Sequence, residues 1–425
     1  MKKINEIFED VIGKSKIPET EKKFIKQELK NFGDKLNKSI ISKKIKAEVF
    51  FGGSFVRDTM TKREQYDADV FVRFDKQYKK ENLTEMLEKI LKPNPNLKLV
   101  HGSRDYFKLK VSENFEIEII PVLKIRKPEE ADNITDLSYF HVNYIKKKMS
   151  EKIKREVIIA KVFCQANHVY GAESYIQGFS GYALELLMIK YKSFLNFLKE
   201  VNKIKNNDKL IVDIEKHYKN KNQIMMDLNE SKLGSPIILV DPTYKQRNAL
   251  AALSLETFNK FKEEARKFLK VPSVEFFTER KVDIEKIKED AKKKKEDFIL
   301  IEIWTDKQEG DIAGSKLLKF YRHLLTEIER FFDIKNKGFN YNGKHAARFF
   351  YAAQKKKEIV VNGPATSDKK NVKEFQKHHK VTYTKKGRFY AKEIVELNLK
   401  RFIDKWKKKN ANKVKGMYIT EIKVL

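Results

Sequence analysis

The residues best suited to chemistry are a short acidic pair, Asp67 and Asp69, separated by one alanine. The pair opens an alternating run typical of a β-strand, in which residues two apart point to the same face of the sheet. Two carboxylates on one face repel each other unless a cation joins them. Because Mg²⁺ prefers oxygen ligands and leaves room for substrate phosphates, the pair is a candidate Mg²⁺ site. A solvated acidic turn is the alternative for such a pair taken alone.

A glycine and a serine upstream of the pair favour a phosphate site. Gly53 follows a predicted strand, and a glycine there lets the backbone approach a phosphate closely. The hydroxyl of Ser54 and the N–H groups that follow can donate hydrogen bonds to that phosphate. Arg57 could add a bidentate contact.

A third carboxylate should then come from a neighbouring strand. The run Phe115-Glu-Ile-Glu-Ile-Ile offers Glu116 and Glu118 on one face and isoleucines on the other. The alternation alone cannot choose between the two glutamates. Both could also be exposed strand residues without a ligand role.

The elements around these residues predict a small sheet in an α/β or α+β domain. Alternating runs predict strands at residues 47–51, 68–74, 97–100, 107–111 and 115–120. Helical spacing predicts helices over residues 1–40, interrupted near Pro18, and over 83–91.

The pattern then becomes mostly helical from about residue 150 to 270 and predicts an α-rich second domain. Asp241-Pro242 is expected to return the chain from a strand to a helix. After the lysine run 292–295, a strand at 298–304 and a helix over 315–332 predict a third, α+β domain.

Composition limits the classes of partner. The chain has 425 residues, and 91 Lys and Arg against 60 Asp and Glu give a net charge of +31, which favours nucleic acid over an anionic membrane surface. The single cysteine, Cys164, allows no internal disulfide and fits a reducing cytosol. No apolar run approaches a membrane span and the N-terminus lacks a secretion signal, so we expect a cytoplasmic protein without membrane contact.

The order of these parts resembles the nucleotidyltransferases of the DNA polymerase β superfamily. More specifically, it resembles the archaeal-type (class I) CCA-adding enzymes, the tRNA nucleotidyltransferases that build the 3′-terminal CCA without a template. The stretches that carry the resemblance are Gly53-Ser-Phe-Val-Arg57-Asp-Thr59, Asp67-Ala-Asp69, Phe140-His141, Tyr170-Gly-Ala-Glu173, Gly178-Phe-Ser-Gly181-Tyr182 and Asp241-Pro-Thr-Tyr-Lys-Gln-Arg247-Asn248.

The resemblance implies an α+β multidomain protein. Residues 1–141 would form a polymerase-β-like nucleotidyltransferase head with a small mixed sheet, and residues 142–271 an α-rich central domain that completes the nucleotide site. Residues 272–425 would form an α+β C-terminal RNA-binding body and tail.

The resemblance also implies roles for individual residues. Asp67, Asp69 and Glu118 would be the catalytic Mg²⁺ ligands, although the family commonly has Glu at the first of these positions and Asp at the third. The groups around the incoming nucleotide would be Gly53, Ser54, Arg57, His141, Lys161, Tyr170 and, for base selection, Arg247. Each has a plainer alternative as a surface residue, a packed ring or a local ion pair.

The reaction implied is attack of a tRNA 3′-hydroxyl on the α-phosphate of CTP or ATP, with release of pyrophosphate. Two other functions stay open: a related template-independent polymerase making poly(A) or 2′–5′ oligoadenylate, and a non-catalytic RNA-binding protein of the same fold. The sequence leaves the oligomeric state open, a homodimer included.

Overall fold

Both acidic runs lie in one five-stranded sheet with the strand order β1-β2-β5-β4-β3. Its strands are β1 (Ala47–Phe51), β2 (Tyr66–Phe74), β3 (Leu97–Val100), β4 (Tyr106–Ser112) and β5 (Phe115–Leu123). The pairing of β2 with β5 is parallel, and the other three pairings are antiparallel. The predicted small mixed sheet is therefore confirmed.

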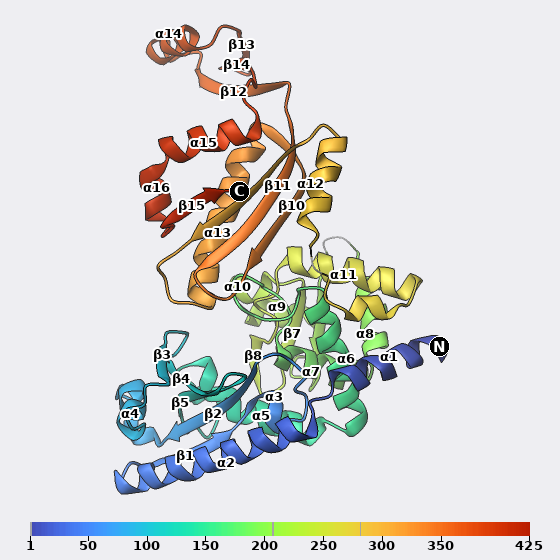
Figure 1. The fold of residues 1–425 in the computed structure, drawn as a ribbon, viewed down its shortest axis with the longest axis vertical. Helices are drawn as coiled ribbons and strands as arrows, with labels where there is room; N and C mark the ends of the chain where they lie inside the picture. Colours follow the sequence, from blue (N-terminus) through green and yellow to red (C-terminus); the bar gives the residue numbers. More distant parts are fainter. Residues whose placement is uncertain (1, 206–207, 281) are drawn as a thin grey trace. The chain divides into compact units, whose positions relative to one another are not determined.

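The structure is a computed structural model, and it describes residues 2–205, 208–280 and 282–425 (Figure 1). The chain divides into two compact units, Met1–Arg280 and Lys281–Leu425. The five-stranded sheet and the predicted site residues all belong to the first unit.

The two faces of the five-stranded sheet differ because the side chains alternate along each strand. One face is apolar, and α2 (Glu19–Ser42) and α4 (Leu83–Ile90) lie along it (Figure 1). Leu29 of α2 and Leu87 of α4 belong to the same core as the strand residues. The strand residues of this core include Ala68, Val70, Val72, Ile117 and Ile119. The residues between them, which include the four acidic side chains, therefore point to the opposite face.

A cluster of phenylalanines forms the core of the helices that follow the sheet. The helices are α5 (Ser138–Lys148), α6 (Glu151–Ala166), α7 (Gly181–Tyr191), α8 (Phe194–Lys203) and α11 (Leu255–Lys270). The N-terminal helix α1 (Lys2–Ser15) joins this core, since the rings of Phe8 and Phe268 stack at 6.1 Å. A helix that the sequence assigns to the first domain thus packs with the second.

The turn at Asp241-Pro242 leads to a strand, so the prediction that it returns the chain to a helix is wrong. The chain turns from β7 (Ile237–Asp241) into antiparallel β8 (Tyr244–Asn248), and β6 (Leu210–Asp213) pairs with β7 in parallel. The Asp241 carboxylate accepts hydrogen bonds from the Thr243 N–H at 2.9 Å and hydroxyl at 2.8 Å, which closes the turn. The next long helix, α11, begins only after the Ser254 N-cap. Between β6 and β7 lie the short helices α9 (Lys221–Asp227) and α10 (Glu230–Leu233).

The second unit confirms the predicted α+β composition. Its larger sheet is antiparallel with the order β10-β11-β9-β15, and its smaller sheet has the order β12-β14-β13. The strands are β9 (Asp297–Trp304), β10 (Phe332–Tyr341), β11 (Ala346–Lys355), β12 (Glu358–Ala365), β13 (Thr382–Lys385), β14 (Arg388–Ile394) and β15 (Glu421–Val424). The helices are α12 (Ile284–Lys293), α13 (Asp311–Glu329), α14 (Lys369–His378), α15 (Leu399–Lys409) and α16 (Ala411–Gly416). Across both units, the helices that the structure describes include none with the length and apolar character needed to span a membrane.

Candidate active site

The parallel pairing of β2 with β5 brings the acidic residues together. Asp69 is the register partner of Glu118, and Asp67 is the partner of Glu116. Since partners in a parallel pair and residues two apart share a face, all four carboxylates project from the same side of the sheet. Glu118 also has a basic neighbour, because Lys108 Nζ on β4 lies 2.8 Å from its Oε1.

Asp69 is the most strongly perturbed of these carboxylates. Burial raises its pKa from 3.8 to about 7, and the negative charges of Glu118 and Asp67 add to the increase. Asp69 is half-buried in the first unit, whereas Asp67 is exposed. A positive charge placed at this face would relieve the repulsion and favour the ionised form of Asp69.

Gly53 lets the turn after β1 pack directly on Asp69. It begins the single turn α3 (Gly53–Val56) with φ at +72°, a conformation that favours glycine. A Cβ atom at this position would lie 1.9 Å from Asp69 Oδ2, so a larger residue would displace the carboxylate. The predicted Gly-Ser turn and the acidic pair are therefore adjacent in space.

A polar pocket lies beside this turn. It contains four of the predicted residues, and its lining is Ser54, Thr59, Met60, Thr61, Arg63, Gln65, Tyr66, Asp67, Lys161 and Tyr170. Lys161 Nζ donates hydrogen bonds to the Thr59 carbonyl at 2.9 Å and the Thr59 hydroxyl at 3.0 Å. Burial lowers the pKa of Lys161 from 10.5 to about 8. The pocket thus combines a buried amine with hydroxyl groups, a donor set suited to a phosphate.

Gly181 at the start of α7 allows two of these groups to approach each other. A Cβ atom there would lie 3.0 Å from the Tyr170 hydroxyl and 3.6 Å from Lys161 Cε. The Arg63 guanidinium lies 5.3 Å from the centre of the Tyr170 ring. Tyr170 therefore lines the pocket together with two basic residues, Arg63 and Lys161.

Arg57 lies outside the pocket lining and is paired with a buried acid. Its Nε lies 3.0 Å from the carboxylate of Glu185, which has no exposed surface. The hydroxyl of Thr59 donates to the same carboxylate at 2.8 Å. Glu185 in α7 therefore fixes the turn after α3 against the central helices.

His141 and Arg247 meet at a second buried acid, Asp241. His141 Nε2 lies 3.0 Å and Arg247 Nη1 2.6 Å from Asp241 Oδ2, and the Tyr182 hydroxyl donates to Oδ1 at 3.0 Å. Burial alone would raise the pKa of Asp241, but the hydrogen bond from His141 and the charges of His141 and Arg247 hold this pKa below its usual value. Asp241 thus stays ionised and orients both predicted nucleotide-binding residues.

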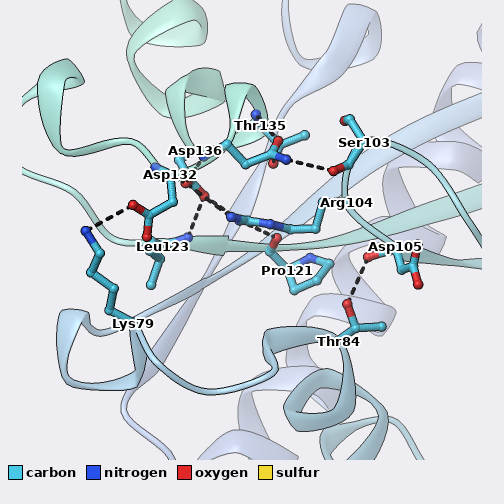
Figure 2. A network of polar contacts seen from close by, with 11 residues as sticks. Lys79, Thr84, Ser103, Arg104, Asp105, Pro121, Leu123, Asp132, Thr135 and Asp136 are labelled. Carbon is cyan, nitrogen blue, oxygen red and sulfur yellow. Dashed lines mark hydrogen bonds and ion pairs between the residues drawn. The ribbon is translucent and has the colours of Figure 1, made fainter.

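A separate network holds the end of β5 (Figure 2). The fully buried carboxylate of Asp136 is paired with Arg104 and accepts hydrogen bonds from the N–H groups of Leu123 at 2.8 Å and Asn133 at 3.0 Å. Arg104 also donates to the Pro121 carbonyl at 3.1 Å. Because Arg104 precedes β4, this network fixes β4 against β5 and so the strands that carry Lys108 and Glu118.

The structure therefore places the predicted residues in two groups. One group surrounds the acidic face and the pocket: Gly53, Ser54, Asp67, Asp69, Glu118, Lys161 and Tyr170. The other contains His141 and Arg247. Arg57 is close to both, since its charge acts on Asp69, whose pKa burial nevertheless raises, and on His141, whose pKa is lowered mainly by burial.

Several polar residues in these two groups were not identified as functional from the sequence. Lys108, Arg63, Glu185 and Asp241 had no assigned role, although Asp241 and Glu185 stand near or within the quoted motifs. The alternation Phe107-Lys-Leu-Lys-Val could have indicated that Lys108 shares a face with the acidic residues, had the strand order been known.

Comparisons with known proteins agree with this architecture. A family model described as a nucleotidyltransferase domain matches residues 34–141, and one described as the second domain of tRNA nucleotidyltransferase matches residues 155–278. Among solved structures, a cytoplasmic RNA terminal U-transferase is 15% identical, with a TM-score of 0.51 over 66% of this chain and 100% of that chain. The Cid1 poly(U) polymerase is 16% identical, with a TM-score of 0.50 over 66% of this chain and 99% of that chain.

The fold and the family models together define a protein with a nucleotidyltransferase domain of the polymerase β type, built on a mixed sheet and followed by an α-rich second domain. A CCA-adding enzyme of Saccharolobus islandicus is 31% identical over 341 residues, which is 78% of this chain and 76% of that protein. The chain belongs to the family of archaeal CCA-adding enzymes.

Two further relatives match over shorter stretches. A CCA-adding enzyme of Nanoarchaeum equitans is 44% identical over 50% of this chain and 52% of its own length. One of Methanocaldococcus jannaschii is 34% identical over 57% of this chain and 54% of its own length. The chain therefore spans about half the length of these two relatives.

Nucleotidyltransferase domains of this type use divalent metal ions, and the acidic face fits such an ion. Its donors are carboxylates, which hard cations prefer, and the pKa of Asp69, raised mainly by burial, is raised further by a repulsion that a cation would offset. Within residues 2–205, 208–280 and 282–425, no three His, Cys, Asp or Glu side chains are already gathered as a metal site. The Glu118 carboxylate instead contacts Lys108.

Proposed function

We propose that this chain adds C, C and A in turn to the 3′ end of tRNA, using CTP and ATP and releasing pyrophosphate. In each step the terminal hydroxyl of the RNA forms a bond to the α-phosphorus of the nucleotide, and the bond to the β-phosphate breaks. The observation that carries the proposal is the pairing of Asp69 with Glu118 beside the pocket that contains Asp67 and Lys161.

Asp67, Asp69 and Glu118 would hold Mg²⁺ on the acidic face of the sheet. Bound Mg²⁺ supplies positive charge for the attacking and leaving oxygens. The alternation of β2 and β5 places the three carboxylates on one face of the sheet, and the packing of Gly53 on Asp69 keeps that carboxylate next to the Gly-Ser turn. This arrangement aligns the reacting groups, which is the main contribution that a protein makes to phosphoryl and nucleotidyl transfer.

The pocket residues would bind the incoming nucleotide. Ser54 and Lys161 would donate to the triphosphate, and the ring of Tyr170 would pack on the sugar or base. Arg247, oriented by Asp241, would hydrogen-bond the base edge and select cytosine or adenine together with the RNA end. His141 also contacts the Asp241 carboxylate, which would therefore hold His141 and Arg247 in one arrangement.

The basic residues of the second unit would bind the RNA. The charge of +31 suits a polyanion, and an A-form stem is recognised mainly through phosphates and 2′-hydroxyls. The candidate clusters are Lys292 to Lys295, Lys355 to Lys357, Lys369-Lys370, Lys385-Lys386-Gly387-Arg388 and Lys405 to Lys415.

The test is product length on tRNA that lacks its CCA tail. With Mg²⁺, we expect two added residues from CTP alone, and three residues ending in A from CTP and ATP together. ATP alone should add little to this substrate. The Asp69→Asn protein, which keeps the size of the side chain and removes its charge, is the matched inactive control.

Other products would refute the proposal. Long homopolymers from ATP alone would assign the site to a poly(A)-type polymerase, and 2′–5′ linkages would assign it to an oligoadenylate synthase. RNA binding without any nucleotide transfer would leave the chain a non-catalytic member of the fold.

A further inference from the structure

Lys108 places a positive charge against the third predicted metal ligand. It lies on β4, where the antiparallel pairing with β5 makes it the register partner of Glu118. Its Nζ lies 2.8 Å from Glu118 Oε1 and 3.8 Å from Glu116 Oε2. The lysine therefore contacts the carboxylates of β5 on the same face that carries Asp67 and Asp69.

The Lys108–Glu118 ion pair differs from a surface ion pair between two mobile side chains. The side chain of Glu118 is 22% exposed and that of Lys108 is 33% exposed. Both strands are fixed, because the Arg104–Asp136 network joins the start of β4 to the end of β5 (Figure 2). The amine is thus held where a cation is needed to offset three carboxylates of like charge.

Lys110 provides a natural comparison on the same strand. It is two residues from Lys108, so it points to the same face, and its register partner is Glu116. Its Nζ, however, donates to Glu113 at 3.1 Å in the turn that follows β4. The two lysines thus carry the same charge on the same face of β4, but only Lys108 contacts Glu118.

We propose that Lys108 is a positioning residue that holds Glu118 on the acidic face while no metal is bound, and that it competes with the divalent ion for that carboxylate. This inference rests on the proposed function, because it takes Glu118 as a metal ligand. Glu118 would hold the ion with a carboxylate that already contacts the Lys108 amine, so the amine and the ion would share this group. The lysine charge also repels the incoming ion.

Removal of the lysine charge should therefore tighten metal binding. The test is the Kd of Mn²⁺, which serves as the probe for the divalent site, measured by calorimetry on the full chain without nucleotide. We expect Lys108→Met to bind Mn²⁺ about fivefold more tightly than the unchanged protein, as a nearby unit charge in a partly solvated site allows. Lys108→Arg, which keeps the charge, should bind Mn²⁺ as the unchanged protein does.

Two controls separate this effect from a general change in charge. Lys110→Met removes the same charge from the same strand and should leave the Kd unchanged. In a Glu118→Gln background, Lys108→Met should tighten binding less than in the unchanged protein, because the competition for the carboxylate is gone and only the repulsion by the lysine charge is removed. Thermal unfolding of each variant checks that the fold is retained.

The possible failures are distinguishable. If the unchanged protein binds Mn²⁺ and Lys108→Met binds it equally or more weakly, or if Lys110→Met gives the same tightening, the role of Lys108 is refuted while the proposed function stands. If the unchanged protein binds no Mn²⁺ even with CTP present, the metal site of the proposed function fails and the role of Lys108 fails with it.

Discussion

Glu118 lies opposite Asp69 in the parallel pairing of β5 with β2, and both side chains project from the face that carries Asp67. The three residues come from two segments separated by β3, β4 and α4. Gly53 packs on Asp69 and Asp67 lines the polar pocket, so the Gly-Ser turn, the pocket and the acidic strands are adjacent in space.

Loss of the Asp69 charge should stabilise the metal-free protein at alkaline pH. The pKa of Asp69 is raised to about 7, so the folded state holds this proton more tightly than the unfolded state does. Stability therefore falls as pH rises from about 4 to about 7, by on the order of 1–2 kcal/mol after allowance for solvent screening. Thermal unfolding in EDTA at pH 5.5 and pH 8 should show this fall for the unchanged protein and not for Asp69→Asn.

A divalent ion should reverse this fall in stability at high pH. Mg²⁺ should raise the unfolding temperature of the unchanged protein more at pH 8 than at pH 5.5, because ionised carboxylates bind the ion and protonated ones do not. Asp10→Asn, at an exposed pair with Lys14, is the matched control and should respond as the unchanged protein does. An equal response of Asp69→Asn to Mg²⁺ would remove Asp69 from the metal site.

Nucleotide affinity should decline as pH rises through the pKa of Lys161. Burial lowers this pKa to about 8, so the amine loses its charge at a pH where surface lysines keep theirs. We expect CTP to bind about three- to tenfold more weakly at pH 9 than at pH 7. Fluorescence or calorimetric titration checks this, and Lys161→Met should give a weak, pH-independent affinity. A flat profile for the unchanged protein would show that Lys161 does not bind the triphosphate.

The network in Figure 2 should contribute to stability. Asp136 is fully buried, so Asp136→Asn would leave the Arg104 charge without its partner and should cost about 2–4 kcal/mol in the free energy of unfolding. Asp132→Asn, which removes an exposed pair with Lys79 in the same loop, should cost about 0.5 kcal/mol or less. Denaturant unfolding checks both, and equal costs would contradict the assigned role of the buried pair.

Removal of the second unit should weaken RNA binding selectively. The boundary between the compact units lies at residues 280 and 281, so a chain ending at Arg280 keeps the whole acidic face and pocket. Its affinity for tRNA should fall at least about tenfold, because all of the candidate basic clusters are lost. Its affinity for CTP should change little. Circular dichroism checks its fold, and unchanged tRNA affinity would place the RNA site in the first unit.

The faces of the strands could be predicted from the sequence, whereas the partners across them could not. The period-two alternation placed Asp67 with Asp69 and Glu116 with Glu118, and each pair does share a face. Which strands are neighbours depends on the whole sheet, so the contact between Lys108 and Glu118 had no local signal.

Buried pairs between distant segments were also beyond prediction. Arg57 and Glu185 are 128 residues apart, and their pairing requires α7 to pack on the turn after α3. Turn chemistry misled the prediction at Asp241-Pro242, since Asp241 accepts from Thr243 and starts a hairpin. The same carboxylate then orients His141 and Arg247, an arrangement that depends on tertiary contacts.

The most direct test of the site compares nucleotide addition by variants of the two glutamates of β5. The quantity to be measured is the rate of CTP incorporation into tailless tRNA by Glu118→Ala, Glu118→Asp and Glu116→Ala at saturating Mg²⁺. Loss of a metal ligand should lower the rate about 100-fold or more in Glu118→Ala, whereas Glu118→Asp should keep activity. Glu116→Ala, the matched control, should retain most of the rate. Equal rates for Glu118→Ala and the unchanged protein would contradict the account.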